Sequence, residues 1–326
     1  MPMGPTRLEI RELNKTFGSA QVLTNVELTV LAGEIHGLAG QNGSGKSTLI
    51  KILTGLYTPD PGADYWVDGA RIRLPVRWRQ VHAAGVSVVH QDLGLLDQLS
   101  VAENICVGGF PTTRMGRIDA GQRDRLAEHT LMRLGVELDP RTPVGTLTAA
   151  ERAEVAIARA MRDYSPGSGL IILDESTRAL AGEDLARIHR LLRRLCTEGS
   201  AVLMISHNLT ELMDVTDRVT ILRDGRLAGG GLATSELSER EIAQRMLGST
   251  VDAIAARSDD HSKAVDSLAM ISGLSGVRAP AVTMRWMALR TWSKARTSSK
   301  KSRQASGMPS SSLAVTGRRS IWRTAS

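Results

Sequence analysis

The chain has 326 residues, 42% of them hydrophobic, which is enough for one large domain or two small ones with real cores. Its two cysteines offer no disulfide framework or metal-binding spacing, and we expect neither a signal peptide nor a membrane span, so the reducing cytoplasm is the default location. The net charge of +7 does not indicate a nucleic-acid partner, because residues 267–326 hold 11 of the 41 basic side chains and none of the 34 acidic ones, which leaves residues 1–266 net acidic.

The first predicted strands enclose a polar segment that contains an aromatic residue. Leu8–Arg11 and Val26–Val30 alternate apolar and polar residues, as half-exposed strands do. Phe17 lies between them, within residues 14–18. Its ring could stack on a flat base, or it could be an apolar plug beneath a loop, which is the commoner role.

The most specific pattern follows, at residues 40–48. It reads glycine, four residues, then Gly-Lys-Ser, and it lies between an apolar strand at 35–39 and a helix at 48–53 that should stop at Gly55. Glycines let backbone N–H groups converge on phosphates, and a helix N-terminus adds partial positive charge, so a chance glycine turn is the weaker interpretation. The expected nucleotide contacts in this loop are Gly40, Gln41, Asn42, Gly43, Ser44, Gly45, Lys46, Ser47 and Thr48.

Two of these side chains have predicted tasks. Lys46 should reach the β- and γ-phosphates, and the Ser47 hydroxyl should hold Mg²⁺.

A strand predicted at 86–90 ends in Gln91. A carboxamide at a strand end beside a phosphate loop can bind Mg²⁺ or the attacking water, although such a residue alone is more often a surface residue. Residues 93–165 are then predicted to be mostly helical, with Asp119 capping a helix that ends at Gly135 and Thr148 opening another helix through capping-box spacing.

An acidic pair, Asp174 and Glu175, follows the continuous apolar run Leu170–Leu173. Such a run is typical of a strand buried on both faces of a parallel sheet. Beside a phosphate loop the pair suggests a division of labour, in which Asp174 holds the Mg²⁺ shell and Glu175 polarises the attacking water. Without that loop it could be a solvated acidic turn.

A second buried strand, Ala201–Ile205, ends in Ser206 and His207. A histidine there can hydrogen-bond a γ-phosphate, although lone histidines are usually structural. Open parallel sheets bind ligands at the carboxyl ends of their strands, so the polar groups at four strand ends should share one site.

The order of these motifs over residues 7–248 resembles the ATP-binding subunits of ABC transporters, and within them the N-terminal half of the tandem-domain ATPases of bacterial monosaccharide importers. The likeness is clearest in Val89–Leu93 with Gln98–Ile105, and in Ile205–Leu209 with Asp217–Gly225. It implies an α/β fold: a P-loop NTPase core with an antiparallel β layer and a helical subdomain.

The resemblance also implies residue roles. Phe17 would stack on adenine, Gln91 would be the coupling-loop glutamine, Glu175 the catalytic base and His207 the switch histidine. With Ser47 and Asp174, Gln91 would complete the Mg²⁺ ligands.

The implied function is the ATP-binding subunit of a sugar importer, peripheral at the cytoplasmic face of the membrane, with ATP and Mg²⁺ as cofactors. Its partners would be a membrane permease, a second nucleotide-binding domain from a twin or another chain, and indirectly a periplasmic or lipid-anchored sugar-binding protein. The alternative is a nucleotide-binding remnant or regulator with little ATPase activity.

Two departures from the family pattern favour that alternative, and a third carries little weight. The signature Leu-Ser-Gly-Gly-Gln falls within residues 147–152. There Ala150 adds a methyl group at a glycine position, which would keep the helix N-terminus away from a phosphate, and Arg152 replaces a neutral amide. Ser176 replaces the usual proline, and residues 178–181 lack an aspartate that sugar-importer ATPases often lack too.

Beyond the domain, residues 249–282 are predicted to be a linker and the start of a second, lost nucleotide-binding domain. Residues 283–326 are predicted to be a disordered basic tail, without a second phosphate loop. A frameshift remnant is the interpretation of this tail that we favour, because GC-rich coding sequence in a wrong frame yields Arg, Ser, Ala and Trp.

Overall fold

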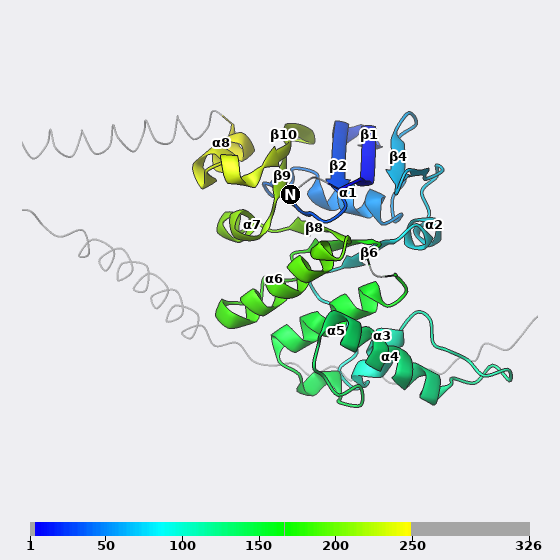
Figure 1. Cartoon of the computed structure of the whole chain (residues 1–326). Helices are drawn as coiled ribbons and strands as arrows, with labels where there is room; N and C mark the ends of the chain where they lie inside the picture. Colours follow the sequence, from blue (N-terminus) through cyan, green and yellow to red (C-terminus); the bar gives the residue numbers. More distant parts are fainter. Residues whose placement is uncertain (1–3, 166, 249–326) are drawn as a thin grey trace, which may run out of the picture. The chain divides into compact units, whose positions relative to one another are not determined.

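The computed structural model describes residues 4–165 and 167–248, which form two β-sheets and the helices packed on them (Figure 1). The linker and tail predicted at 249–326 lie outside these residues. No helix in the described ranges is long and apolar enough to cross a membrane.

The smaller sheet is antiparallel and has the strand order β2-β1-β4-β5. Its strands are β1 (Thr6–Phe17), β2 (Ala20–Leu31), β4 (Asp64–Val67) and β5 (Ala70–Arg71). The first two are longer than the sequence predicted, and Phe17 ends β1 opposite Ala20 instead of lying in a turn. Cross-strand pairing has therefore extended the strands through a polar segment.

The larger sheet has the order β10-β9-β3-β8-β7-β6, and all its neighbours are parallel except β10 and β9. Its strands are β3 (Ile35–Gly40), β6 (Val86–Val89), β7 (Leu170–Asp174), β8 (Ala201–Ile205), β9 (Arg218–Arg223) and β10 (Arg226–Ala233). The predicted parallel sheet is confirmed, and the carboxyl ends of β3, β6, β7 and β8 lie at one edge.

One hydrophobic core lies between the two sheets. A second core lies on the other face of the larger sheet, beneath helices. All five residues of β8 are buried, and they alternate between the two: Leu203 lies in the core between the sheets, whereas Met204 lies in the core beneath the helices. The strand β7 alternates in the same way. Burial on both faces is the physical reason for the continuous apolar runs in the sequence.

The helices are α1 (Lys46–Leu53), α2 (Trp78–Ala83), α3 (Val101–Cys106), α4 (Ala120–Leu134), α5 (Ala149–Met161), α6 (Gly182–Thr197), α7 (Leu209–Val215) and α8 (Glu239–Leu247). Helices α3, α4 and α5 pack together at the bottom of Figure 1, below the parallel sheet, and form the predicted helical subdomain. Short 3₁₀ turns cover Val144–Thr146 and Thr234–Glu236.

Local signals set the ends of these helices. The Asp119 side chain accepts a hydrogen bond from Gln122 N at 2.9 Å and caps α4, which ends at Gly135 in the left-handed region with φ 57°. Helix α1 ends just before Gly55, where φ is +75°. The predicted caps are confirmed, because each depends on residues within one turn.

Candidate functional site

The loop between β3 and α1 needs glycine for two physical reasons. Gly45 stands at the N-terminus of α1 with φ +103°, a conformation that residues with a side chain rarely adopt. At Gly40 a Cβ atom would lie 2.5 Å from the carbonyl oxygen of Leu222 on the neighbouring strand. The loop can therefore follow this path only with glycine at these positions.

The loop presents donors that its own residues do not fully use. Lys46 is buried, and its Nζ donates to the carbonyl oxygens of Gly40 and Gln41 at 2.6 and 2.9 Å. The Ser44 hydroxyl is buried without a hydrogen-bond partner among the described residues. Because an ammonium group and a free hydroxyl are both donors, the loop fits an anionic ligand such as a phosphate.

Two carboxylates lie near Lys46. Burial lowers the pKa of Lys46, while the carboxylates of Glu175 and Asp174 act in the opposite direction. Both acids line the same hollow as Lys46, which measures about 260 Å³ and also includes Ser47. The ends of β3 and β7 and the start of α1 therefore converge on one site, as the sequence predicted.

The Mg²⁺ ligands expected from the sequence are only partly brought together. Ser47 and Asp174 line the same hollow. No group of three His, Cys, Asp or Glu side chains among the described residues could hold a metal ion unaided. The donors present fit Mg²⁺, which takes one or two protein oxygens and completes its shell with water and phosphates.

Sequence reasoning did not assign His90 to this site. Its Nδ1 lies 3.8 Å from Asp174 Oδ2, and this carboxylate raises the pKa of His90. The only signal was its place at a strand end, one residue before Gln91.

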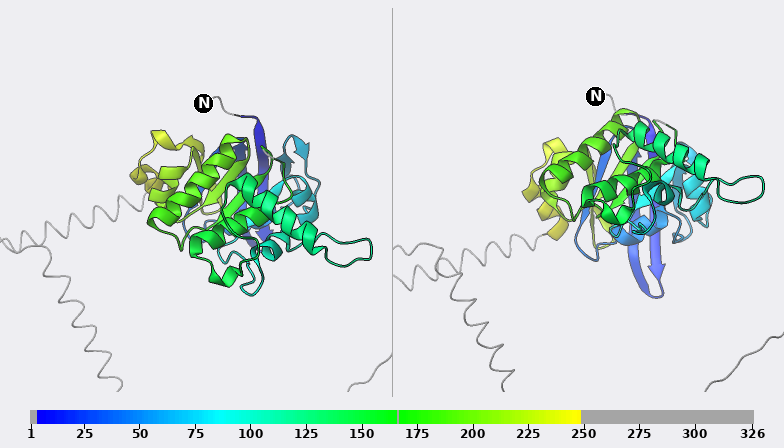
Figure 2. Two further views of the ribbon diagram at one scale, coloured as in Figure 1. Left: turned by 60° about the horizontal axis from the view of Figure 1, so that its bottom comes forward. Right: turned by 90° about the horizontal axis from the view of Figure 1, so that it is seen from below.

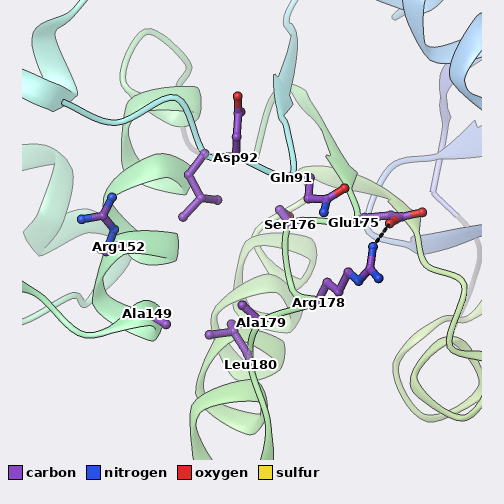
Figure 3. A pocket seen from close by; sticks show the side chains of 10 residues that line it. Gln91, Asp92, Ala149, Arg152, Glu175, Ser176, Arg178, Ala179 and Leu180 are labelled. Atoms are coloured by element: carbon purple, nitrogen blue, oxygen red, sulfur yellow. Dashed lines mark ion pairs between the residues drawn. The ribbon is translucent and has the colours of Figure 1, made fainter. Parts of the chain in front are cut away.

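The two residues expected to act in hydrolysis are neighbours. Glu175 follows β7, and its Oε2 lies 3.5 Å from Nδ1 of His207, which follows β8. The same oxygen lies 3.6 Å from the Arg178 guanidinium, a contact that the sequence did not suggest and that Figure 3 shows. Register places the two side chains together, because Asp174 pairs with Ile205 across the sheet.

Gln91 is exposed and lines a second hollow of about 440 Å³. Glu175 borders both hollows, and Figure 3 shows Gln91 beside it, across from Ala149 and Arg152 on α5. The structure thus brings Gln91 to Glu175 rather than to Ser47, and the Mg²⁺ role of Gln91 stays a prediction.

Phe17 belongs to neither hydrophobic core and is 41% exposed, which is contrary to the plug interpretation. Its ring centroid lies 5.3 Å from that of Tyr57, and Lys15 Nζ lies 4.9 Å from the Phe17 ring. It does not line the hollow of Lys46. Stacking on a base therefore stays a prediction.

The start of α5 confirms one expectation and contradicts another. Thr148 caps the helix in a full capping box with Glu151. Ala150, however, is completely buried in the core, whereas Ala149 is exposed. The interpretation that the Ala150 methyl group keeps the helix N-terminus away from a phosphate is therefore wrong, because packing turns this side chain inward.

Arg152 is engaged within the chain. Its guanidinium lies 2.6 Å from Asp97 Oδ1 and donates to the carbonyl oxygen of Val144 at 3.3 Å. It ties the start of α5 to the segment after Gln91.

We expect Ala150→Gly to destabilise the domain by about 1–2 kcal/mol without raising ATP turnover. The change removes a buried methyl group and adds backbone entropy to a helix. Chemical denaturation of both proteins measures the difference, with Ala149→Gly at the exposed neighbouring position as the control. If the Ala150→Gly variant is as stable as the unaltered chain and hydrolyses ATP faster, the Ala150 methyl group does keep the helix N-terminus away from the phosphate.

Comparison with known proteins gives three kinds of match. The ABC transporter family model matches residues 23–178. The ribose import ATP-binding protein RbsA 2 of Burkholderia pseudomallei is 42% identical over 246 residues, 74% of this chain and 46% of that protein. RbsA 1 of Rubrobacter xylanophilus is 40% identical over 245 residues, 75% of this chain and 48% of that protein. The chain thus spans about half the length of the curated relatives it matches.

Solved structures match the fold. The ADP conformation of MJ1267, an ATP-binding cassette of an ABC transporter, has a TM-score of 0.61 at 23% identity and covers 77% of this chain and 98% of that one. The structure of cbiO1 from Clostridium perfringens has a TM-score of 0.61 at 22% identity, with coverage of 79% and 99%.

Proposed function

The chain carries an ATP-binding domain of the ABC transporter family, and on this premise we propose that it is the ATP-binding subunit of an importer. It would couple binding and hydrolysis of ATP to uptake of a sugar through a separate permease. What supports this function most directly is the single hollow in which Lys46 meets Asp174 and Glu175. It joins a phosphate-binding loop to the carboxylates that hydrolysis requires.

Each group has a task in this proposal. Lys46 exchanges its two loop carbonyls for phosphate oxygens, and the free Ser44 hydroxyl adds a donor. Ser47 and Asp174 hold Mg²⁺, which when bound neutralises charge on the phosphates. Glu175 accepts the proton of the attacking water, and His207, 3.5 Å away, donates to the terminal phosphate.

A second nucleotide-binding domain is part of the proposal, from another copy of this chain or from a different chain. The N-terminus of α5 is exposed at Thr148 and Ala149. Its N–H groups and helix dipole can face a phosphate held by a neighbouring domain.

The sugar class follows from the relatives, whose names describe ribose import. We propose a pentose or similar monosaccharide as the transported substrate. The sugar itself would be recognised by the permease and a periplasmic or lipid-anchored binding protein, with this chain at the cytoplasmic face.

One observation favours the alternative of a nucleotide-binding remnant or regulator with little hydrolysis. Arg152 in the signature segment is tied to Asp97.

We expect ATP turnover to rise several-fold when the purified chain is reconstituted with its cognate permease, and labelled ribose to enter such vesicles. The matched control is the same permease reconstituted with the Glu175→Gln variant of this chain. Tight ATP binding with no turnover in either condition would favour the remnant instead.

A further inference from the structure

A short hairpin, residues 112–118, connects α3 to α4 and exposes all of its residues. Gly116 N donates to Thr113 O at 2.9 Å, Thr113 N donates to Arg117 O at 2.8 Å, and Thr112 bridges to Ile118. The hairpin is therefore an ordered element whose backbone bonds close on themselves. Its tip is formed by Arg114 and Met115.

The side chains at this tip are unusual for a surface that faces only water. Met115 is 88% exposed and Ile118 is 55% exposed, so the hairpin presents two large apolar groups to the surroundings. Arg114 and Arg117 flank Met115, and the hairpin contains no acidic residue. Neither arginine forms an ion pair within residues 4–165 and 167–248.

The hairpin also has a defined direction. In Figures 1 and 2 it projects from the α3–α4 layer on the side of the domain where α2 lies, away from α8. An exposed tryptophan, Trp78, lies on α2, and Val107 and Gly108 at the base of the hairpin line a hollow with it. Exposed apolar and aromatic groups thus gather on this side.

We propose that the hairpin rests on the surface of a membrane that contains anionic lipids. Arg114 and Arg117 pair with lipid phosphates, while Met115 and Ile118 enter the headgroup layer. A basic segment with apolar residues beside it is the chemistry that binds such a surface. The inference goes beyond the proposed function, because it holds whether or not the chain hydrolyses ATP.

Size favours a lipid surface over a protein. A stable protein interface needs about 800 Å² and 20–30 residues from each partner, with matched shape. Seven residues that project from the domain offer much less. A headgroup layer needs no matched shape, and each arginine near an anionic surface strengthens binding about fivefold.

The test places an environment-sensitive fluorophore on the full chain at Met115→Cys. Labelling is selective because Cys106 and Cys196 are both buried. A second variant, Met132→Cys on α4, is the matched control, since Met132 is also a methionine and is 75% exposed. Each protein is mixed with phosphatidylcholine vesicles with or without phosphatidylglycerol.

The amount of bound protein is not the readout, because the 11 basic residues at 267–326 attract every variant to anionic vesicles alike. The probe at residue 115 should brighten about twofold or more and shift to the blue with phosphatidylglycerol, and much less without it, while the probe at residue 132 stays unchanged. Adding Arg114→Glu and Arg117→Glu should abolish the change at 115, and high salt should reduce it.

Equal responses at the two positions, or none at 115 on vesicles that bind the protein, would overturn the inference. The inference would also be overturned if the probe at residue 115 responded in neutral vesicles, but only when these contain the permease. The hairpin would then contact a protein surface.

Discussion

Replacing Glu175 with glutamine should leave ATP binding intact and lower ATP turnover about 10²–10⁴-fold, the usual share of general-base catalysis. Glutamine keeps the shape of the side chain and can still accept hydrogen bonds, but it cannot take a proton from water. The position is well placed for this role. Glu175 borders both hollows, one with Lys46 and the other with Gln91.

The measurement is steady-state turnover next to nucleotide affinity in both proteins. Glu183→Gln is the matched control, because Glu183 is an acid on α6 that is 95% exposed and lies in neither hollow. We expect this control to behave as the unaltered chain. If Glu175→Gln also turns over at the unaltered rate, another group activates the water.

The same variant addresses the source of the second ATP-binding half. When hydrolysis is blocked, a dimer that closes around ATP should accumulate. A shift to twice the mass on adding ATP to Glu175→Gln would identify a second copy of this chain as the partner, whereas a persistent monomer would indicate another protein.

The parts of the site that the sequence predicted depend on short-range rules. The loop at 40–48, the capping box at Thr148 and the end of α4 at Gly135 are each fixed by residues within one turn. The parallel strands were predictable because burial on both faces leaves a continuous apolar run. Their shared edge then brings Glu175 and His207 together without further information.

What the sequence missed depends on contacts between distant residues or on side-chain direction. Arg152 and Asp97 are 55 positions apart, and nothing in either segment indicates their pairing. The sequence places an alanine at position 150, where the signature has glycine. The direction of its methyl group, into the core, is set by packing. The contact of Arg178 with Glu175 likewise arises from the turn after β7, where Glu175 has φ +50°.

We expect Lys46→Ala to weaken ATP binding at least tenfold. Lys46 is a buried ammonium group whose hydrogen-bond acceptors among the described residues are the two carbonyls of its own loop, so several phosphate oxygens can replace them. Charge-assisted hydrogen bonds of this kind contribute about 1.5–3 kcal/mol each, and about 1.4 kcal/mol corresponds to a tenfold change in affinity. Equilibrium binding of a fluorescent ATP analogue measures the loss.

Folding must be separated from binding in this experiment, because the substitution also removes the bonds to Gly40 and Gln41. Lys51→Ala, in the same helix, is the matched control, since Lys51 contacts the Tyr57 ring and does not line the hollow of Lys46. Lys46→Arg retains the charge but replaces a compact ammonium group with a planar guanidinium group, so it too should weaken binding. If both Lys46 variants fold and bind ATP as tightly as the unaltered chain, the phosphates are held elsewhere and the proposed function fails. If only the arginine variant retains affinity, charge rather than geometry is what the loop supplies.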